Sequence, residues 1–193
     1  MGNVVFSISM SLDGFITGPN RRPGTELGDG GEGLHEWAFG GDPQNSVFLE
    51  QALSGTGAIV CGRRTYDDSL AYWGADGPSG ALRRPVVVVT HEAPESFPEN
   101  GVYRFETGGL AAAVQTARAM AGDKDVSVMG GANVGQQAIR EKLVDVVAIS
   151  LIPLILGGGV RLFEHLEGEQ IRLEPIDILH TRQATHLTYR PVG

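Results

Sequence analysis

The feature that most constrains this fold is a run of four consecutive valines, Val86–Val89. β-branched residues favour extended backbone, and an unbroken apolar run of this length suits a strand buried on both faces, as in a parallel sheet. Other strand-like runs occur at 4–9, 58–61, 126–129 and 144–152. Parallel strands need long crossover connections, which are usually helices. The chain is therefore predicted to form a central, mostly parallel sheet.

Helical segments are predicted between these runs. Residues 110–121 place apolar side chains at the spacing of one helix face, and Gly122 follows them as a stop. Asp42 can cap a helix and Pro43 suits its first position, so a second helix is expected to start there and to end near Gly55. Strand and helix alternate along most of the chain, which predicts an α/β fold with helices on both faces of the sheet.

Two stretches fall outside this alternation. The last strand-like segments, 172–179 and 185–189, predict an antiparallel C-terminal hairpin. Residues 18–41 are crowded with glycine, proline and charge, and so long a loop is unusual in a compact domain unless it covers a site. We therefore expect one domain over residues 1–193, with a glycine-rich lid loop at about 18–41.

Charge and composition narrow the class of partner. The net charge is -8, and no basic cluster interleaved with aromatic residues offsets it, so nucleic acid is not expected. The apolar runs are shorter than the roughly 18 residues of a membrane helix. Cys61 is the single cysteine and the first residues lack a secretory pattern, so a cytoplasmic protein with a small-molecule substrate is expected. No metal site is predicted.

Three turns follow predicted strands and together could hold a dinucleotide. They are Gly62-Arg63-Arg64-Thr65, Thr90-His91 and Gly130-Gly131-Ala132-Asn133. Glycine lets backbone amides approach an anion, a helix start presents unpaired N–H groups, and arginine adds forked donors that match phosphate. The sequence contains neither G-x-G-x-x-G after its first strand nor G-x-x-x-x-G-K-[ST], so the two commonest nucleotide-binding signatures do not apply.

Six segments carry a family resemblance over nearly the whole chain: SMSLDGFITG, AIVCGRRTYDD, VVVVTHEAP, VSVMGGANVGQQAI, ISLIPLILGGGVRLF and THLTYRP. In this order they resemble the dihydrofolate reductase-like superfamily, in particular its branch similar to the C-terminal reductase domain of bacterial riboflavin biosynthesis proteins. The resemblance implies a three-layer dihydrofolate reductase-like fold and a homodimer. It also implies an NADPH-dependent enzyme that transfers hydride to a small pterin-like or pyrimidine-like heterocycle or to a carbonyl compound.

The resemblance assigns cofactor contacts residue by residue. Ser9 and Ile16 match positions that flank the nicotinamide. The first turn matches the helix start that holds cofactor phosphates, where an arginine favours the 2′-phosphate of NADPH; its residues are Gly62, Arg63, Arg64 and Thr65. Thr90 and His91 match the strand end beside the adenosine ribose. The second turn, which supports the pyrophosphate, is matched by Gly130, Gly131, Ala132, Asn133 and Val134.

A reduction also needs a proton, which comes from a side chain or from water. Asp13 is one candidate donor, because its loop faces the reacting ring in similar proteins. Asp42 is the other, because it follows Trp37 at a distance comparable to that in folate reductases. A turn role for Asp13 and a capping role for Asp42 are the structural alternatives. Glu36 and Glu50 are further candidate acids.

The substrate stays open at this stage. Phe15, Trp37 and Arg84 are the candidate substrate contacts, and Arg84 falls near the family position that grips an anionic tail. Met129 stands where riboflavin reductases usually carry a glutamate, and the folate-type Trp-x-x-Pro-x-acid pattern is broken. Two alternative functions are a nucleotide-binding or regulatory protein of the same fold without turnover, and a reductase that binds a flavin or deazaflavin.

Overall fold

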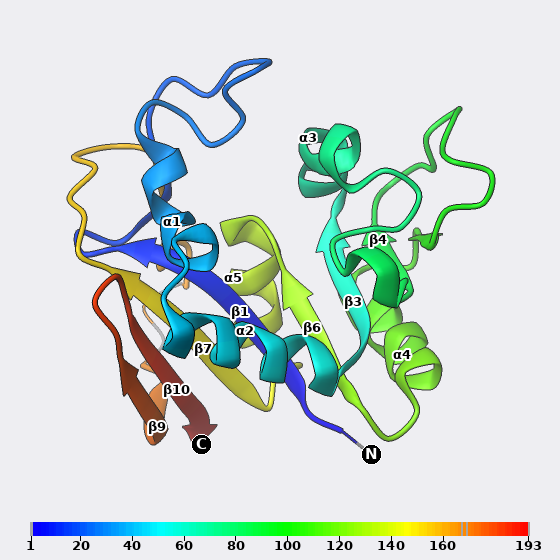
Figure 1. Ribbon diagram of the computed structural model, residues 1–193. Coiled ribbons are helices and arrows are strands. Elements are labelled where there is room, and N and C mark those ends of the chain that lie inside the picture. The colour runs from blue at the N-terminus through cyan, green and yellow to red at the C-terminus, as the bar shows by residue number, and fades with distance from the viewer. Residues whose placement is uncertain (1, 167, 169, 193) are drawn as a thin grey trace.

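The centre of the molecule is a sheet of eight strands in the order β5-β4-β3-β6-β1-β7-β10-β9 (Figure 1). The computed structural model describes residues 2–166, 168 and 170–192. The parallel strands are β1 (Val4–Ser11), β3 (Thr56–Gly62), β4 (Val86–Val89), β5 (Tyr103–Glu106), β6 (Asp125–Met129) and β7 (Val146–Ile152). An antiparallel hairpin of β9 (Arg172–His180) and β10 (Thr185–Val192) extends the sheet beyond β7. The predicted fold class is confirmed.

Helices cover both faces of this sheet, as predicted. The four longer helices are α2 (Pro43–Gly55), α3 (Arg63–Trp73), α4 (Leu110–Ala121) and α5 (Ala132–Arg140). On one face α4 and α5 pack against the sheet, where Phe6 and Val128 are fully buried in the main hydrophobic cluster. On the opposite face α3 inserts Tyr66 beside Cys61. No helix in the described part of the chain is long and apolar enough to cross a membrane.

The helix boundaries follow the local signals in the sequence. Asp42 is the N-cap of α2, and its carboxylate accepts hydrogen bonds from the backbone N–H groups of Gln44 and Asn45, while Pro43 occupies the first turn. Gly122 ends α4 with φ +63°, a conformation that side chains other than glycine rarely adopt. Both predicted helices are confirmed at these ends.

Several short elements escaped prediction. The segment at 18–41 is not all loop, because it contains η1 (Gly31–Leu34) and α1 (Glu36–Phe39). β2 (Phe15–Thr17) pairs with β8 (Val160–Arg161) in a separate ribbon that is too short to show a period in sequence. β5 lies at the sheet edge and carries the charged Arg104 and Glu106, so it lacks the apolar run by which buried strands are recognised.

Candidate functional site

Two neighbouring parallel strands, β3 and β6, send their following helices to opposite faces of the sheet. α3 follows β3 on the face of Cys61, and α5 follows β6 on the face of Val128. In open α/β sheets, ligands bind in the crevice that such a reversal creates beyond the carboxyl ends of the strands. Two of the turns predicted to hold a dinucleotide, at Gly62 and Gly130, lie at this point.

These two turns are in direct contact. The Thr65 hydroxyl oxygen of α3 accepts a hydrogen bond of 3.2 Å from the Gly131 backbone N–H. Gly130 has φ +107°, and a Cβ there would lie 2.4 Å from Thr65 Oγ1, so only glycine fits. Val134 Cγ2 approaches Gly62 in the same way, at 2.9 Å from where a Cβ would be. The N-termini of α3 and α5 are therefore fixed next to each other.

Neither of these N-termini is capped by a side chain of the described residues. Their N-cap residues, Gly62 and Gly131, have no side chain with which to cap, and neither helix has an acidic residue in its first turn. Arg64 is exposed and forms no ion pair or side-chain hydrogen bond with the described residues. Unpaired N–H groups and the helix dipoles favour negative charge at this place. The arrangement suits a group with two linked phosphates.

The third predicted turn is tied to the first through Arg63. Its Nε donates to both carboxylate oxygens of Asp67, at 2.8 and 2.9 Å, and its Nη1 donates to the Glu92 carbonyl at 2.9 Å. The Thr90 hydroxyl donates to the same carbonyl at 2.6 Å. His91, between Thr90 and Glu92, is exposed. The three turns that sequence placed at strand ends are thus brought together at one edge.

Ser9, near the carboxyl end of β1, belongs to a buried polar network. Its hydroxyl oxygen accepts a hydrogen bond of 2.9 Å from Trp37 Nε1 of α1, and no described residue accepts a bond from its O–H. The Trp37 ring packs edge-on against His186, with centroids 4.7 Å apart. His186 lies 2.8 Å from Ser150 Oγ and 3.0 Å from Asn45 Oδ1. Sequence analysis missed this histidine, although it lies in the family segment THLTYRP, because no site position was assigned to that segment.

The network fixes the orientation of each member. Asn45 donates through its amide nitrogen to Gln183, so its oxygen faces His186 and accepts from Nε2. Burial lowers the pKa of His186, and the neutral ring then accepts the Ser150 hydroxyl proton at Nδ1. Trp37 is thereby held in place between Ser9 and His186.

The Asp13 carboxylate accepts hydrogen bonds from three donors. These are the Ser11 hydroxyl at 2.6 Å and the backbone N–H groups of Leu156 and Gly157 at 3.1 and 2.8 Å. The Ser11 bond is the main cause that lowers the pKa of Asp13 to about 2, and the two backbone bonds add to it. The group is therefore ionised near neutral pH and joins the end of β1 to the 153–159 turn.

The other predicted residues lie around this centre. Phe15 and Ile16 are buried on β2, and the Arg161 guanidinium carbon lies 4.4 Å from the centroid of the Phe15 ring. Arg84 precedes β4 and therefore lies at the amino edge of the sheet, opposite the three turns. Its Nε is buried with no hydrogen-bond partner among the described residues. Asp42 is engaged as the cap of α2.

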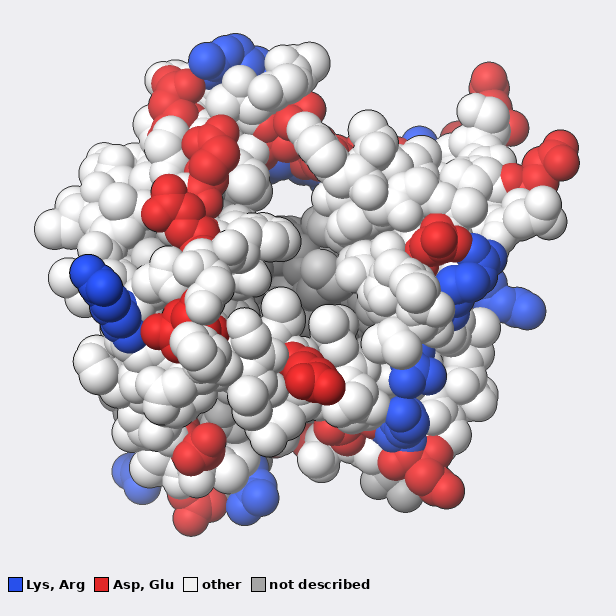
Figure 2. Space-filling view, in the orientation of Figure 1, with Lys and Arg blue, Asp and Glu red and all other residues white. Residues whose placement is uncertain are grey.

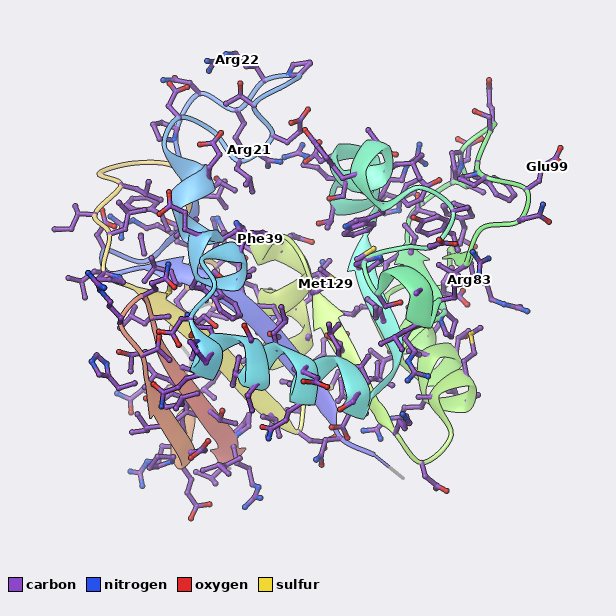
Figure 3. All side chains as sticks on the ribbon, viewed as in Figure 1. Arg21, Arg22, Phe39, Arg83, Glu99 and Met129 are labelled. Carbon is purple, nitrogen blue, oxygen red and sulfur yellow. The ribbon has the colours of Figure 1, made fainter. Side chains whose placement is uncertain are left out.

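A cleft opens between α1 and α2 on one side and α3 on the other. Figure 2 shows the molecule hollowed between these two parts. In Figure 3 Phe39 of α1 stands at one rim and Met129, at the end of β6, lies toward the middle of the opening. A separate groove of about 440 Å³ lies along α2. Its walls include Leu49, Glu50, Leu53, Leu82, Arg84 and Lys124.

The 18–30 loop reaches across this cleft. Arg21 of the loop hydrogen-bonds and ion-pairs with Asp68 of α3, and both side chains are about 70 % buried. Within the loop, Gly18 N–H donates to the Leu27 carbonyl and Asp29 N–H to the Pro19 carbonyl, which keeps its two arms together. The loop is therefore an ordered hairpin that is attached to the opposite wall.

Comparison with known proteins decides the family. The sequence matches the RibD C-terminal domain over residues 3–187. The chain belongs to the RibD C-terminal domain family. This membership confirms the resemblance recognised in the sequence and supports a reductase role. A comparison with curated proteins gave no match.

Solved structures agree on the fold. A protein described as a riboflavin biosynthesis protein from Shewanella sp. PV-4 has a TM-score of 0.73 at 24 % identity, covering 99 % of both chains. The riboflavin biosynthesis reductase Rib7 of Saccharomyces cerevisiae has a TM-score of 0.63 at 16 % identity, covering 99 % of this chain and 90 % of that one. Dihydrofolate reductase from Enterococcus faecalis has a TM-score of 0.55 at 14 % identity, with 98 and 97 % covered. These likenesses confirm a dihydrofolate reductase-like fold.

Within this RibD C-terminal domain, the structure adds residues that sequence analysis did not select. Ser7 is exposed on β1 although Phe6 beside it is buried, and Arg21 ion-pairs with Asp68 of α3. Alternate serines at 7, 9 and 11 were a visible signal in β1. Whether helices cover that face depends on packing between distant segments, which the spacing of serines does not determine.

Proposed function

We propose that the protein is an NADPH-dependent reductase that transfers hydride to a small heterocyclic, pterin-like or pyrimidine-like, or carbonyl substrate. The observation that carries this proposal is the junction of two uncapped helix N-termini through the Thr65–Gly131 hydrogen bond at the switch point of the sheet. Family membership supports the reductase role, and a related fold is seen in a dihydrofolate reductase complexed with NADP(H).

The residues at this edge fit a dinucleotide phosphate cofactor. The N–H groups of the α3 and α5 first turns would hold the pyrophosphate, and Arg63 and Arg64 would add positive charge beside Thr90 and His91. Ser9 would offer its free O–H toward the nicotinamide. When bound, NADPH supplies the hydride, and the chain's own task is to bind and orient the two reactants.

Of the two possible proton sources, a side chain or water, the geometry favours water. Asp13 is ionised and accepts hydrogen bonds from three donors, so it holds no proton to give near neutral pH. Asp42 is engaged in capping α2. We therefore assign both carboxylates positioning roles and leave the proton to solvent that enters the cleft.

Gly131→Asp tests the cofactor site directly. A Cβ at Gly131 meets no atom within 4 Å, so the side chain fits, and its carboxylate would cap α5 and repel phosphate. We expect calorimetric titration to show at least a tenfold weaker affinity for NADPH. Gly131→Ala is the matched control and should bind like the wild type. Equal NADPH affinity in Gly131→Asp and Gly131→Ala would contradict the site.

Turnover separates this function from its alternatives. With NADPH bound, loss of its near-ultraviolet absorbance in the presence of pterins, pyrimidines and conjugated carbonyl compounds is the expected result. Binding without oxidation of NADPH by any acceptor would favour a nucleotide-binding protein without turnover. A yellow preparation with a flavin absorption band would favour the flavin- or deazaflavin-binding alternative.

We also propose roles for two hairpins. The 18–30 hairpin would act as the lid of the cleft, and the C-terminal hairpin of β9 and β10 would form the contact of a homodimer. β9 lies at the sheet edge with Leu173, Ile176 and Ile178 exposed, which gives a second copy an apolar surface to cover. Light scattering is expected to give about 41 kDa, twice the 20.5 kDa of one chain; a 20.5 kDa particle would exclude the dimer.

A further inference from the structure

The middle of the sheet is uncovered on one face only. Ser7 lies on β1, which is hydrogen-bonded to β6 and β7 on its two sides, and yet its side chain is exposed. On the opposite face of the same strand, Phe6 is completely buried. An exposed residue at the centre of an eight-stranded sheet requires a gap in the helical layer, and here the gap lies between α2 and α3.

The described residues at the centre of this floor, Ser7, Ala148, Ser127 and Met129, have side chains that carry no charge. The strand register places Ala148 directly beside Ser7, and the Phe6–Val128 pair places Met129 at its other side. Ser127, one row away beside Val5, is also only half-buried. A hydroxyl group donates and accepts hydrogen bonds but carries no charge, and a thioether packs well on ring faces. This floor therefore suits an uncharged group with polar atoms at its edge.

The rim adds an aromatic surface above this floor. Phe39 is 85 % exposed on α1, and Figure 3 shows it at the edge of the opening toward which Met129 lies. The charged side chains of Glu50, Arg84 and Lys124 line the separate groove along α2. A flat ring that binds between the Phe39 rim and the Met129 floor would be transferred out of water, and no charge would be buried.

From these contacts we propose that the substrate is an uncharged planar ring with a conjugated carbonyl group, whose oxygen is bound by the Ser7 hydroxyl. This inference rests on the proposed reductase function and names its substrate class. Hydride from the nicotinamide forms a bond to the carbon β to the carbonyl, and the C=C π bond breaks. Its electron pair shifts to the oxygen, which accepts a hydrogen bond from Ser7, and a proton from water completes the reduced product. The cofactor is left oxidised.

This chemistry agrees with the state of the Asp13 carboxylate, which follows the carboxyl end of β1. A ring whose basic nitrogen must be protonated before reduction requires an acid that holds its proton near neutral pH. Asp13 does not meet this requirement, because its hydrogen bonds lower its pKa to about 2. A conjugated carbonyl needs only stabilisation of the developing negative charge on oxygen, which a hydroxyl donor provides.

Two naphthoquinones that differ in charge test the proposal. The neutral probe is 2-methyl-1,4-naphthoquinone and the anionic probe is 1,4-naphthoquinone-2-sulfonate. Oxidation of NADPH gives kcat/KM, and quenching of tryptophan fluorescence in the full chain saturated with NADP⁺ gives probe affinity. We expect kcat/KM at least tenfold higher for the neutral probe. Ser7→Ala should lower that value about tenfold, as expected for loss of one hydrogen bond to a charged oxygen.

Ser96→Ala is the matched control, because Ser96 is exposed in the 91–101 loop, outside the cleft. It should leave both kcat/KM and quenching unchanged. Faster reaction of the sulfonate, wild-type kinetics in Ser7→Ala, or absence of quenching by the neutral quinone would each overturn the inference. None of these results affects the proposed cofactor site, which fails instead when NADPH does not bind.

Discussion

Breaking the Arg21–Asp68 ion pair should speed the exchange of cofactor. The pair joins the 18–30 hairpin to α3 across the cleft, and its side chains are 26 and 30 % exposed. Asp68→Asn keeps the shape of the side chain and removes its charge. Partly exposed ion pairs contribute about 0.5–1 kcal/mol, so the closed state should be weakened about two- to fivefold. Because opening of the proposed lid would break this pair, the change should appear mainly as faster release.

Stopped-flow displacement of NADPH measures this release rate. Salt should raise the wild-type rate toward that of Asp68→Asn, because screening weakens the same pair, and should change the variant much less. Arg22→Ala is the matched control: the Arg22–Asp29 pair lies within the hairpin and does not cross the cleft. A release rate in Asp68→Asn that equals the Arg22→Ala rate would refute the reasoning about the lid.

Three further predictions concern polar groups of the site. Asp42→Ala should lower the free energy of unfolding by about 0.5–2 kcal/mol in denaturant titration, through loss of the α2 cap, and leave NADPH affinity unchanged. Burial lowers the pKa of His186, so its stabilising contribution is complete above its usual pKa and falls as the pH drops below that value. His186→Gln should therefore flatten the dependence of the thermal unfolding temperature on pH below that value. The pKa of Asp13 is about 2, so the contribution of its ionised carboxylate to stability is present above pH 4 and is lost toward pH 2. Asp13→Asn should therefore show a shallower acid unfolding curve. An unchanged curve would contradict the hydrogen bonding of Asp13.

The parallel core was predictable because its signals are local. Val86–Val89 reads as a doubly buried strand, and Asp42-Pro43 and Gly122 mark helix ends by backbone preference alone. The antiparallel hairpin at the C-terminus followed from strand-like runs without a helix between them. By contrast, β2 and β8 are stabilised by pairing with each other, although Thr17 and Val160 are 143 residues apart in the sequence. Neither segment is long enough for its structure to be predicted from its own residues.

The candidate site was predictable where glycine and helix starts coincide. Gly62 and Gly130 were selected for their turns, and the structure brings them together through Thr65. The open floor at Ser7 and the His186 network could not be predicted, because each depends on which distant helix covers a strand face. The position of Asp13 in the sequence likewise gave no sign that Leu156 and Gly157 would bind its carboxylate.

The place of β1 in the sheet also affects how the chain can fold. It precedes both of its partner strands in the chain by a long interval, because these partners are Val126–Val128 and Val146–Ile152, more than a hundred residues later. Contacts of such long sequence separation slow folding, because chain entropy is lost before they can form. Until β6 and β7 have been synthesised, the apolar side chains of β1 cannot be buried in the sheet. The nascent chain is therefore most prone to aggregation during this interval. Truncations before β7 should therefore be insoluble rather than partly active.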